Sequence, residues 1–304
     1  MKNKIKFSIV IALAPWREAE IIPYIKKQDY PKNKFEIIVI KGLNVPDNRN
    51  NGVKKAKGEI VVFLDDDAII ERDLLNKMDK FFMDHPEIDI LGGPQLTPRS
   101  DKLFAKISGY ALGSPFGAFG FYKRYTKAKL NLNADSSYIT GANLTVKRNI
   151  FKKIKFDRKI YPADDVNFVN LAKEAGFKVG YSPEILIYHR RRANLRGLIE
   201  QIFDYGQSRS NKKLAAEHNK IPFFLIPSLF LIYLLSLPAL YFISKLFLIP
   251  LSFYIALSLI FSIYESFKNY NFMSLFILPF LFLTIHLSYG AGVLYKKIKN
   301  IFNK

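Results

Sequence analysis

The chain has 304 residues and carries 46 lysine and arginine residues against 26 aspartate and glutamate residues, a formal net charge of +20. It contains no cysteine, so disulfide bonds, thiolate metal sites and cysteine nucleophiles are excluded. The positive charge alone would suit a nucleic-acid-binding protein. The sequence contains no recognisable nucleic-acid-binding module, however, and we expect no nucleic acid among its partners.

The first third of the chain alternates short apolar runs with charged stretches. Buried strands are predicted for the apolar runs at residues 7–14, 35–40 and 59–64. Helices are predicted for the stretches between and after them, at residues 17–27, 48–57 and 71–84. This alternation predicts a parallel sheet with right-handed crossovers, and therefore an α/β fold.

The pattern loosens after Gly92. We expect a glycine- and aromatic-rich loop at 109–120, a strand at 140–146, a helix at 164–175 and one or two strands within 179–188. An amphipathic helix is predicted at 194–217, because its apolar residues recur at helical spacing. Basic residues crowd around this helix, and such a helix lies among lipid headgroups with its cations near the phosphates. Membrane lipids are therefore expected partners.

Residues 221–295 form an almost uncharged segment, interrupted only by Lys245, Glu265 and Lys268. Three blocks within it approach the roughly 20 residues that cross a bilayer as a helix: 221–243, 246–264 and 272–295. A helix in a soluble core would keep a polar face, which these blocks lack. We therefore predict a multi-pass membrane protein, and the basic residues beside its first span favour the cytosolic face for the domain that precedes it.

The number of spans stays open at this point. The C-terminal lysines are Lys296, Lys297, Lys299 and Lys304. Three full spans would place them outside the cell, against the tendency of basic residues to stay in the cytoplasm. Prolines at 222, 227, 238 and 250 allow one block to be re-entrant or interfacial. The predicted organisation is a cytosolic domain at 1–193, an interfacial helix at 194–220, and two or three spans with a basic tail at 221–304.

Two acidic clusters stand at the ends of predicted elements. Asp65, Asp66 and Asp67 directly follow the third predicted strand, and ligands of open α/β sheets bind beyond the carboxyl ends of the strands. Carboxylate oxygens suit Mg²⁺ or Mn²⁺, although an acidic surface turn before a helix would look the same. Asp164 and Asp165 begin a helix, where they could be a simple N-cap or could accept a proton.

Taken in chain order, the motifs of residues 5–210 resemble those of the family 2 glycosyltransferases, inverting enzymes of the GT-A fold. The matching pieces are Ala14-Pro15-Trp16-Arg17-Glu18, Gln28-Asp29-Tyr30-Pro31, Phe35-Glu36-Ile37-Ile38-Val39, Arg49-Asn50-Asn51-Gly52, the run 57–67, Gly141-Ala142-Asn143, Ala163-Asp164-Asp165, Gly176-Phe177 and His189. The resemblance implies a Rossmann-like, mostly parallel sheet, followed here by transmembrane helices. It also implies transfer of a sugar from a nucleotide-sugar with the help of Mg²⁺ or Mn²⁺.

The resemblance implies a role for each matching residue. The metal ligands are Asp65, Asp67 and His189. The nucleotide-binding residues are Pro15, Glu18, Asn50, Asp65 and Asp66. The catalytic base is Asp165, with Asp164 as its acidic partner. The acceptor or diphosphate side is formed by Gly141, Ala142, Asn143, Arg190, Arg191, Gln201 and Arg209.

Two departures from the family pattern concern the nucleotide. The first turn usually carries an asparagine where this chain has Arg17, and the aspartate after the second strand is replaced in the run Lys41-Gly42-Leu43-Asn44. The expected donor is therefore of the UDP or GDP type, with the base left open. The expected acceptor is a lipid-linked glycan, a polyprenyl phosphate or a polysaccharide. The alternative is a non-catalytic homologue that scaffolds a membrane glycan-assembly complex.

Overall fold

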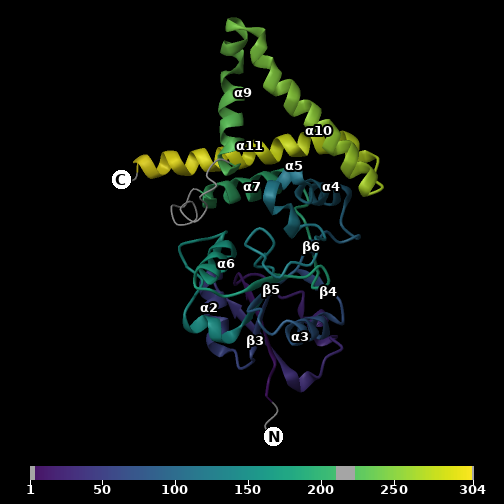
Figure 1. Ribbon diagram of the computed structural model, residues 1–304, viewed down its shortest axis with the longest axis vertical. Helices are drawn as coiled ribbons and strands as arrows, with labels where there is room; N and C mark the ends of the chain where they lie inside the picture. Colours follow the sequence, from purple (N-terminus) through teal and green to yellow (C-terminus); the bar gives the residue numbers. More distant parts are fainter. Residues whose placement is uncertain (1–3, 210–222, 303–304) are drawn as a thin grey trace. The chain divides into compact units, whose positions relative to one another are not determined.

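The computed structural model describes residues 4–209 and 223–302, which form two compact units. The first unit comprises Met1–Pro98 and Lys123–Arg190, and the second comprises Arg99–Tyr122 and Arg191–Lys304. Figure 1 shows the elements of both units. The segment 99–122 thus groups with the C-terminal helices, whereas the sequence analysis places it within the catalytic domain.

The first unit is built on a six-stranded sheet in the order β2-β1-β3-β7-β5-β8. Its strands are β1 (Phe7–Leu13), β2 (Phe35–Lys41), β3 (Ile60–Leu64), β5 (Ile90–Gly92), β7 (Asn143–Lys147) and β8 (Val179–Tyr181). β7 is antiparallel to both of its neighbours, and the other paired strands are parallel. The predicted α/β class with a mostly parallel sheet is confirmed.

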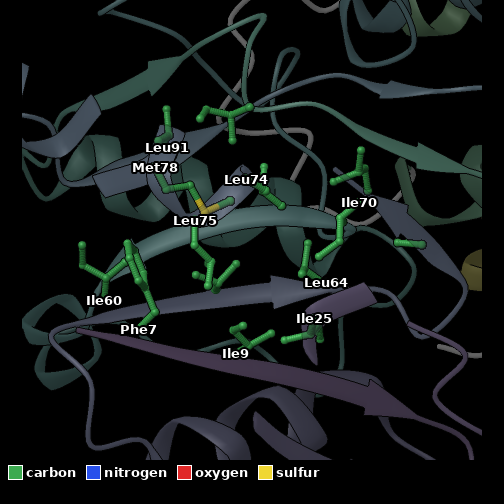
Figure 2. Close-up of a cluster of buried hydrophobic side chains, with 14 of the residues drawn as sticks. Phe7, Ile9, Ile25, Ile60, Leu64, Ile70, Leu74, Leu75, Met78 and Leu91 are labelled. Atoms are coloured by element: carbon green, nitrogen blue, oxygen red, sulfur yellow. The ribbon is translucent and has the colours of Figure 1, made fainter. Parts of the chain in front are cut away.

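The central strands are continuous apolar runs in the sequence because both faces of the sheet are buried, as β3 shows. All five of its residues are buried, and successive side chains point to opposite faces of the sheet. Ile60, Val62 and Leu64 join the core that lies against α1 (Ile22–Lys26) and α3 (Leu74–Asp84). Figure 2 shows side chains of β1, β3 and α3 gathered in this cluster.

The opposite face of the sheet carries an aromatic core. Phe63 of β3 meets Phe156 edge-on, with ring centroids 5.2 Å apart, and Phe156 stacks on Phe168 at 4.5 Å. Phe168 belongs to α6 (Asp164–Glu174), so this stack fixes α6 against the sheet. α2 (Val45–Lys55) contacts β1 and β2. The two helices that carry candidate site residues are thereby anchored to the central strands.

A second, smaller sheet lies beside the acidic cluster. Its strands are β4 (Ala68–Ile70), β6 (Gln95–Leu96) and β9 (Ile187–His189), in the order β4-β9-β6. β4 and β9 are antiparallel, and Ala68 lies opposite His189. Because β4 follows the acidic cluster directly, this pairing carries His189 to it.

Two sequence-based expectations are wrong in this part of the chain. The loop expected at 109–120 is helical, in α4 (Leu103–Leu112), α5 (Pro115–Ala118) and the 3₁₀ helix η2 (Phe119–Arg124). Gly117 allows close packing, since a Cβ on it would lie 2.0 Å from the Ala111 carbonyl oxygen. The helix expected at 17–27 is limited to α1, because residues before it form turns and Pro23 occupies its first turn.

The second unit contains α7 (Leu195–Arg209) and three long helices: α9 (Ile226–Ile243), α10 (Ile249–Lys268) and α11 (Met273–Phe302). Each of the three is long and apolar enough to cross a membrane. The amphipathic helix predicted at 194–217 is confirmed as far as Arg209, and its remainder lies outside the described residues. The buried positions of α7 are Leu198, Ile202 and Gly206, and α7 packs on α11.

Candidate active site

The carboxyl end of β3 carries the acidic cluster. Asp65, Asp66 and Asp67 follow β3 directly, and β4 begins at Ala68. Because Ala68 pairs with His189, the imidazole is held beside the carboxylates. His189 Nε2 lies 3.3 Å from Asp65 Oδ2 and 3.3 Å from Asp67 Oδ1. Residues more than a hundred positions apart in the chain therefore meet at one point.

The side chains of Asp65, Asp67 and His189 fit a divalent metal ion. One ligand atom from each residue can be chosen so that all three atoms lie within 4.8 Å of one another. Two carboxylate oxygens and one imidazole nitrogen leave further coordination positions open, and Mg²⁺ or Mn²⁺ fills such positions with phosphate oxygens and water. The three residues predicted as metal ligands thus lie together.

Arg17 bridges Asp66 and Asp67. Its Nε lies 2.7 Å from Asp66 Oδ2, and its Nη2 lies 3.0 Å from Asp67 Oδ2. Burial alone would raise the pKa of Asp67, but His189 and Arg17 outweigh it and hold that pKa well below its usual range. Burial raises the pKa of Asp66 to about 6, and Arg17 offsets only part of that effect. Asp67 therefore stays ionised to lower pH than Asp66 does.

Arg49 on α2 connects the acidic cluster with the acidic pair on α6. One of its nitrogens donates to Asp164, and Nη2 lies 3.8 Å from Asp65 Oδ1. Burial opposes the charge on Arg49, but the carboxylates around it, Asp164 foremost, raise its pKa. Gly141 leaves room for this guanidinium, because a Cβ at that position would lie 2.6 Å from Arg49 Nη2 and would displace it. Arg49 belongs to a motif that resembles the family pattern, but no role for it is predicted from the sequence.

Asn50, the next residue, has a different set of contacts. Its Nδ2 donates to the Phe156 carbonyl oxygen at 2.8 Å, and its Oδ1 accepts from the Phe156 backbone N–H at 3.1 Å. The nitrogen and the oxygen of the Asn50 side-chain amide thereby both hold α2 to the segment that precedes α6. In this helix it is Arg49 that reaches the carboxylates, and nucleotide binding by Asn50 stays a prediction.

The two carboxylates of the acidic pair have different surroundings. Asp165 Oδ2 accepts from the Gly141 backbone N–H at 2.9 Å and lies 3.4 Å from Arg124 Nη1. Its Oδ1 accepts from the backbone N–H of the residue that follows, at 2.8 Å. Burial raises the pKa of Asp164, although Arg49 opposes the shift. Asp164 is thus closely paired with Arg49, whereas Asp165 accepts from two backbone N–H groups and lies farther from its buried cation, Arg124.

Arg124 is the second functional candidate that the sequence analysis misses. Its guanidinium also donates to the Ser136 carbonyl oxygen, with Nε at 3.1 Å. The side chain is buried, with 9% of the residue exposed. A lone arginine between Lys123 and Tyr125 carries no motif, so only the fold reveals that it approaches Asp165.

Most of the other predicted residues of this unit lie at the same edge of the sheet. Pro15 and Glu18 belong to the exposed turn that follows the carboxyl end of β1, as Arg17 does. Ala142 precedes β7, whose first residue Asn143 lies opposite the last residue of β3. Asn143 is fully buried and its Nδ2 donates to the Ile185 carbonyl oxygen at 2.6 Å, so this side chain holds the edge together.

A cavity of about 320 Å³ opens beside Asp67. It is lined by Glu20, Pro23, Tyr24, Lys27, Asp67, Ala68, Ile69 and Arg190. Arg190 Nη1 lies 3.3 Å from Glu20 Oε2 at the edge of this space. The arginine predicted on the acceptor or diphosphate side therefore faces the same cavity as one of the candidate metal ligands.

Three further predicted residues belong to the second unit. The Arg191 backbone N–H donates to Asp101 Oδ2 at 3.2 Å, and Gln201 Nε2 donates to the Tyr205 hydroxyl at 3.0 Å. The guanidinium of Arg209 lies 4.3 Å from the centre of an aromatic ring in η2. A role for Arg191, Gln201 and Arg209 on the acceptor side stays a prediction.

Comparisons with known proteins give the family and the fold. A family model described as "Glycosyltransferase like family 2" matches residues 9–203. The chain is similar to the solved structure of the mannosyltransferase PcManGT from Pyrobaculum calidifontis in complex with GDP-Man and Mn²⁺. The identity is 16%, the match covers 97% of this chain and 87% of that one, and the TM-score is 0.58.

A second solved structure is more distant. S. aureus TarS 1–349 in complex with UDP matches with 16% identity over 73% of this chain and 75% of that one, at a TM-score of 0.47. No curated protein matches the chain. The likeness to PcManGT covers nearly the whole chain and supports the fold, including the helices after the sheet.

Proposed function

Because the chain belongs to glycosyltransferase family 2, we propose that it moves a sugar from a nucleotide-sugar to a membrane-associated acceptor, with inversion at the anomeric carbon. The observation that carries this proposal is that Asp65, Asp67 and His189 lie together at the end of β3. Arg49 lies between this cluster and Asp164 and contacts both. Sugar transfer needs charge stabilisation at the diphosphate and a base at the acceptor, and these two clusters supply both.

On the donor side, Asp65, Asp67 and His189 are the proposed ligands of Mg²⁺ or Mn²⁺. An ion bound there supplies positive charge to the diphosphate. The turn with Pro15 and Glu18, together with Asn50 and Asp66, is proposed to bind the nucleotide. PcManGT was solved with GDP-Man and Mn²⁺, and the donor of this chain is proposed to be of the GDP or UDP type.

On the acceptor side, Asp165 is the proposed base. Its carboxylate takes the proton of the acceptor hydroxyl while the hydroxyl oxygen bonds to the anomeric carbon and the bond from that carbon to the diphosphate breaks. The Gly141 N–H orients the carboxylate, and Arg49 neutralises the neighbouring Asp164. The other residues proposed on this side are Ala142, Asn143, Arg190, Arg191, Gln201 and Arg209.

The apolar helices α9, α10 and α11 suit an anchor in the membrane. We propose a multi-pass protein whose catalytic unit faces the cytosol, where nucleotide-sugars are found. The basic residues of α7 and the segment before it suit the anionic inner leaflet. The acceptor is a lipid-linked glycan, a polyprenyl phosphate or a polysaccharide at that surface.

The proposal is tested with a panel of UDP- and GDP-sugars, the full-length protein in detergent, Mn²⁺ or Mg²⁺, and membrane lipid extract as the acceptor source. We expect metal-dependent release of the nucleoside diphosphate from one donor, lost in Asp165→Asn and kept in Arg72→Gln, which alters only an exposed ion pair. Metal-dependent donor binding without release would favour the non-catalytic scaffold. No binding of any donor would overturn the proposal.

A further inference from the structure

The three long helices of the second unit form the sides of a triangle. α9 and α10 are joined by the short helix η5 (Lys245–Leu248), and their other ends both contact α11. Ser228 Oγ, near the start of α9, donates to the Gly290 carbonyl oxygen at 3.2 Å. The hydroxyls of Ser266, near the end of α10, and Ser274 are 2.7 Å apart. Figure 1 shows α11 running across the two open ends.

The lengths of these sides prevent all three helices from crossing a bilayer together. At about 1.5 Å per residue, α9 is about 27 Å long, α10 is about 30 Å long, and the two contact points on α11 are about 24 Å apart. α9 and α10 thus match a hydrocarbon core of about 30 Å with a moderate tilt. α11 joins their open ends, so it must then lie close to the membrane plane.

α7 shows at which depth α11 lies. The two helices touch through glycines, since a Cβ on Gly206 of α7 would lie 2.2 Å from the Tyr289 carbonyl oxygen, and Gly292 of α11 is approached as closely. α7 also carries the exposed ion pair Arg196–Glu200, which hydrocarbon does not tolerate. Because α11 is in backbone contact with α7, it lies at the level of the headgroups.

The charges of α9, η5, α10 and α11 support the same arrangement, because in these described helices they occur only at or beyond the corners. Lys245 is exposed at the corner where α9 meets α10. Glu265 and Lys268 form an ion pair of 3.2 Å at the corner where α10 meets α11. The lysines of α11 follow its contact with α9: Lys296, Lys297 and Lys299. The sides between carry exposed apolar side chains, among them Leu229, Leu235, Phe253, Ile260, Phe276 and Phe280.

We propose that α9 and α10 cross the membrane as a hairpin with Lys245 among the far headgroups, and that α11 lies in the near headgroup layer without crossing. The chain then leaves α11 on the side from which it entered α9. The C-terminal lysines therefore share the side of α7, in agreement with the positive-inside tendency. This inference rests on the proposed membrane anchoring and is independent of the sugar chemistry.

The absence of native cysteine allows a clean labelling experiment on the full chain. Ser244→Cys probes the corner beside Lys245, and Asn300→Cys probes the end of α11. Met83→Cys, at an exposed position of α3, reports the side of the catalytic unit. A membrane-impermeant maleimide is added to intact cells, and in parallel to lysed cells.

We expect intact cells to be labelled at Ser244→Cys alone, and lysed cells at all three positions. Labelling of Asn300→Cys from outside together with Ser244→Cys would show that α11 crosses, and would overturn the proposal. Protection of Ser244→Cys from both sides would overturn it equally, because the hairpin would only dip into the bilayer. Labelling of Met83→Cys and Asn300→Cys alone from outside would keep the two crossings and refute the cytosolic face. Release of the protein by an alkaline wash would refute the anchoring itself.

Discussion

Arg49 and Asp164 form an ion pair in which both side chains are more than nine-tenths buried, with 8% and 3% of their surfaces exposed. Such a pair is costly to desolvate, and removal of one partner leaves the other charge buried and unpaired. Arg49 also lies 3.8 Å from Asp65. The stability of α6 against α2 and the shape of the acidic cluster therefore depend on the same side chain.

Arg49→Met is expected to lower the free energy of unfolding by about 3–5 kcal/mol, because it leaves Asp164 without its cation. The double variant Arg49→Met with Asp164→Asn is expected to be more stable than Arg49→Met alone, since no charge then remains unpaired. Arg72→Met, which removes only an exposed pair with Asp29, should change stability by less than about 1 kcal/mol. Thermal unfolding in detergent measures all three. A double variant as unstable as the single one would show that the pair is not the cause.

Substitutions of Asp164 and Asp165 should have different effects on turnover and stability. Asp165→Asn removes the proposed base and is expected to lower kcat by about 10²–10⁴-fold with little change in donor affinity. Asp164→Asn leaves the buried Arg49 with only the more distant Asp65 as an ion-pair partner, so its main expected effect is a lower melting temperature. Turnover, donor binding and melting temperature are measured for both variants. If the folded Asp164→Asn protein loses more turnover than Asp165→Asn, the roles are reversed.

The sheet and its acidic edge could be predicted from the sequence because β3 is apolar on both faces and ends directly before Asp65. Arg49 and Arg124 could not be assigned in this way. A basic residue in a polar segment usually faces solvent, and only the packing of distant segments makes these two buried partners of Asp164 and Asp165. The helical structure of segment 109–120 could not be predicted either, because glycine is compatible both with a turn and with a close helix contact.

The members of the acidic cluster are expected to differ in metal binding. Asp67→Asn removes a candidate ligand that also contacts His189, and should abolish measurable Mn²⁺ binding. Asp66→Asn is a matched control, because Asp66 is adjacent in sequence and forms an ion pair with Arg17 but lies outside the ligand set. Titration of Mn²⁺ followed by electron paramagnetic resonance distinguishes the two without an activity assay. Unchanged binding in Asp67→Asn would remove Asp67 from the site.

Arg17 stands where the family usually carries asparagine, and its guanidinium holds Asp67 Oδ2 at 3.0 Å. Arg17→Asn is expected to tighten Mn²⁺ binding about two- to fivefold in the absence of donor, because a competing, half-exposed cation is removed. His189→Asn should weaken the binding instead, since it removes a candidate ligand. The same titration checks both variants. Weaker binding by Arg17→Asn would mean that Arg17 positions Asp67 for the metal rather than competing with it.

The last prediction concerns the contact between α7 and α11. A Cβ on Gly292 would lie 2.1 Å from the Phe203 carbonyl oxygen, and backbone cannot move aside as a flexible side chain does. Gly292→Ala should therefore force the helices apart and destabilise the second unit by about 1–3 kcal/mol. Gly197→Ala is the matched control on α7, because its nearest neighbour would be 3.4 Å away and alanine favours the helix. The melting temperature in detergent should fall for Gly292→Ala and stay level or rise for Gly197→Ala. Equal stability of the two variants would show that α7 and α11 do not depend on this close crossing, and would weaken the use of α7 as the marker of α11's depth.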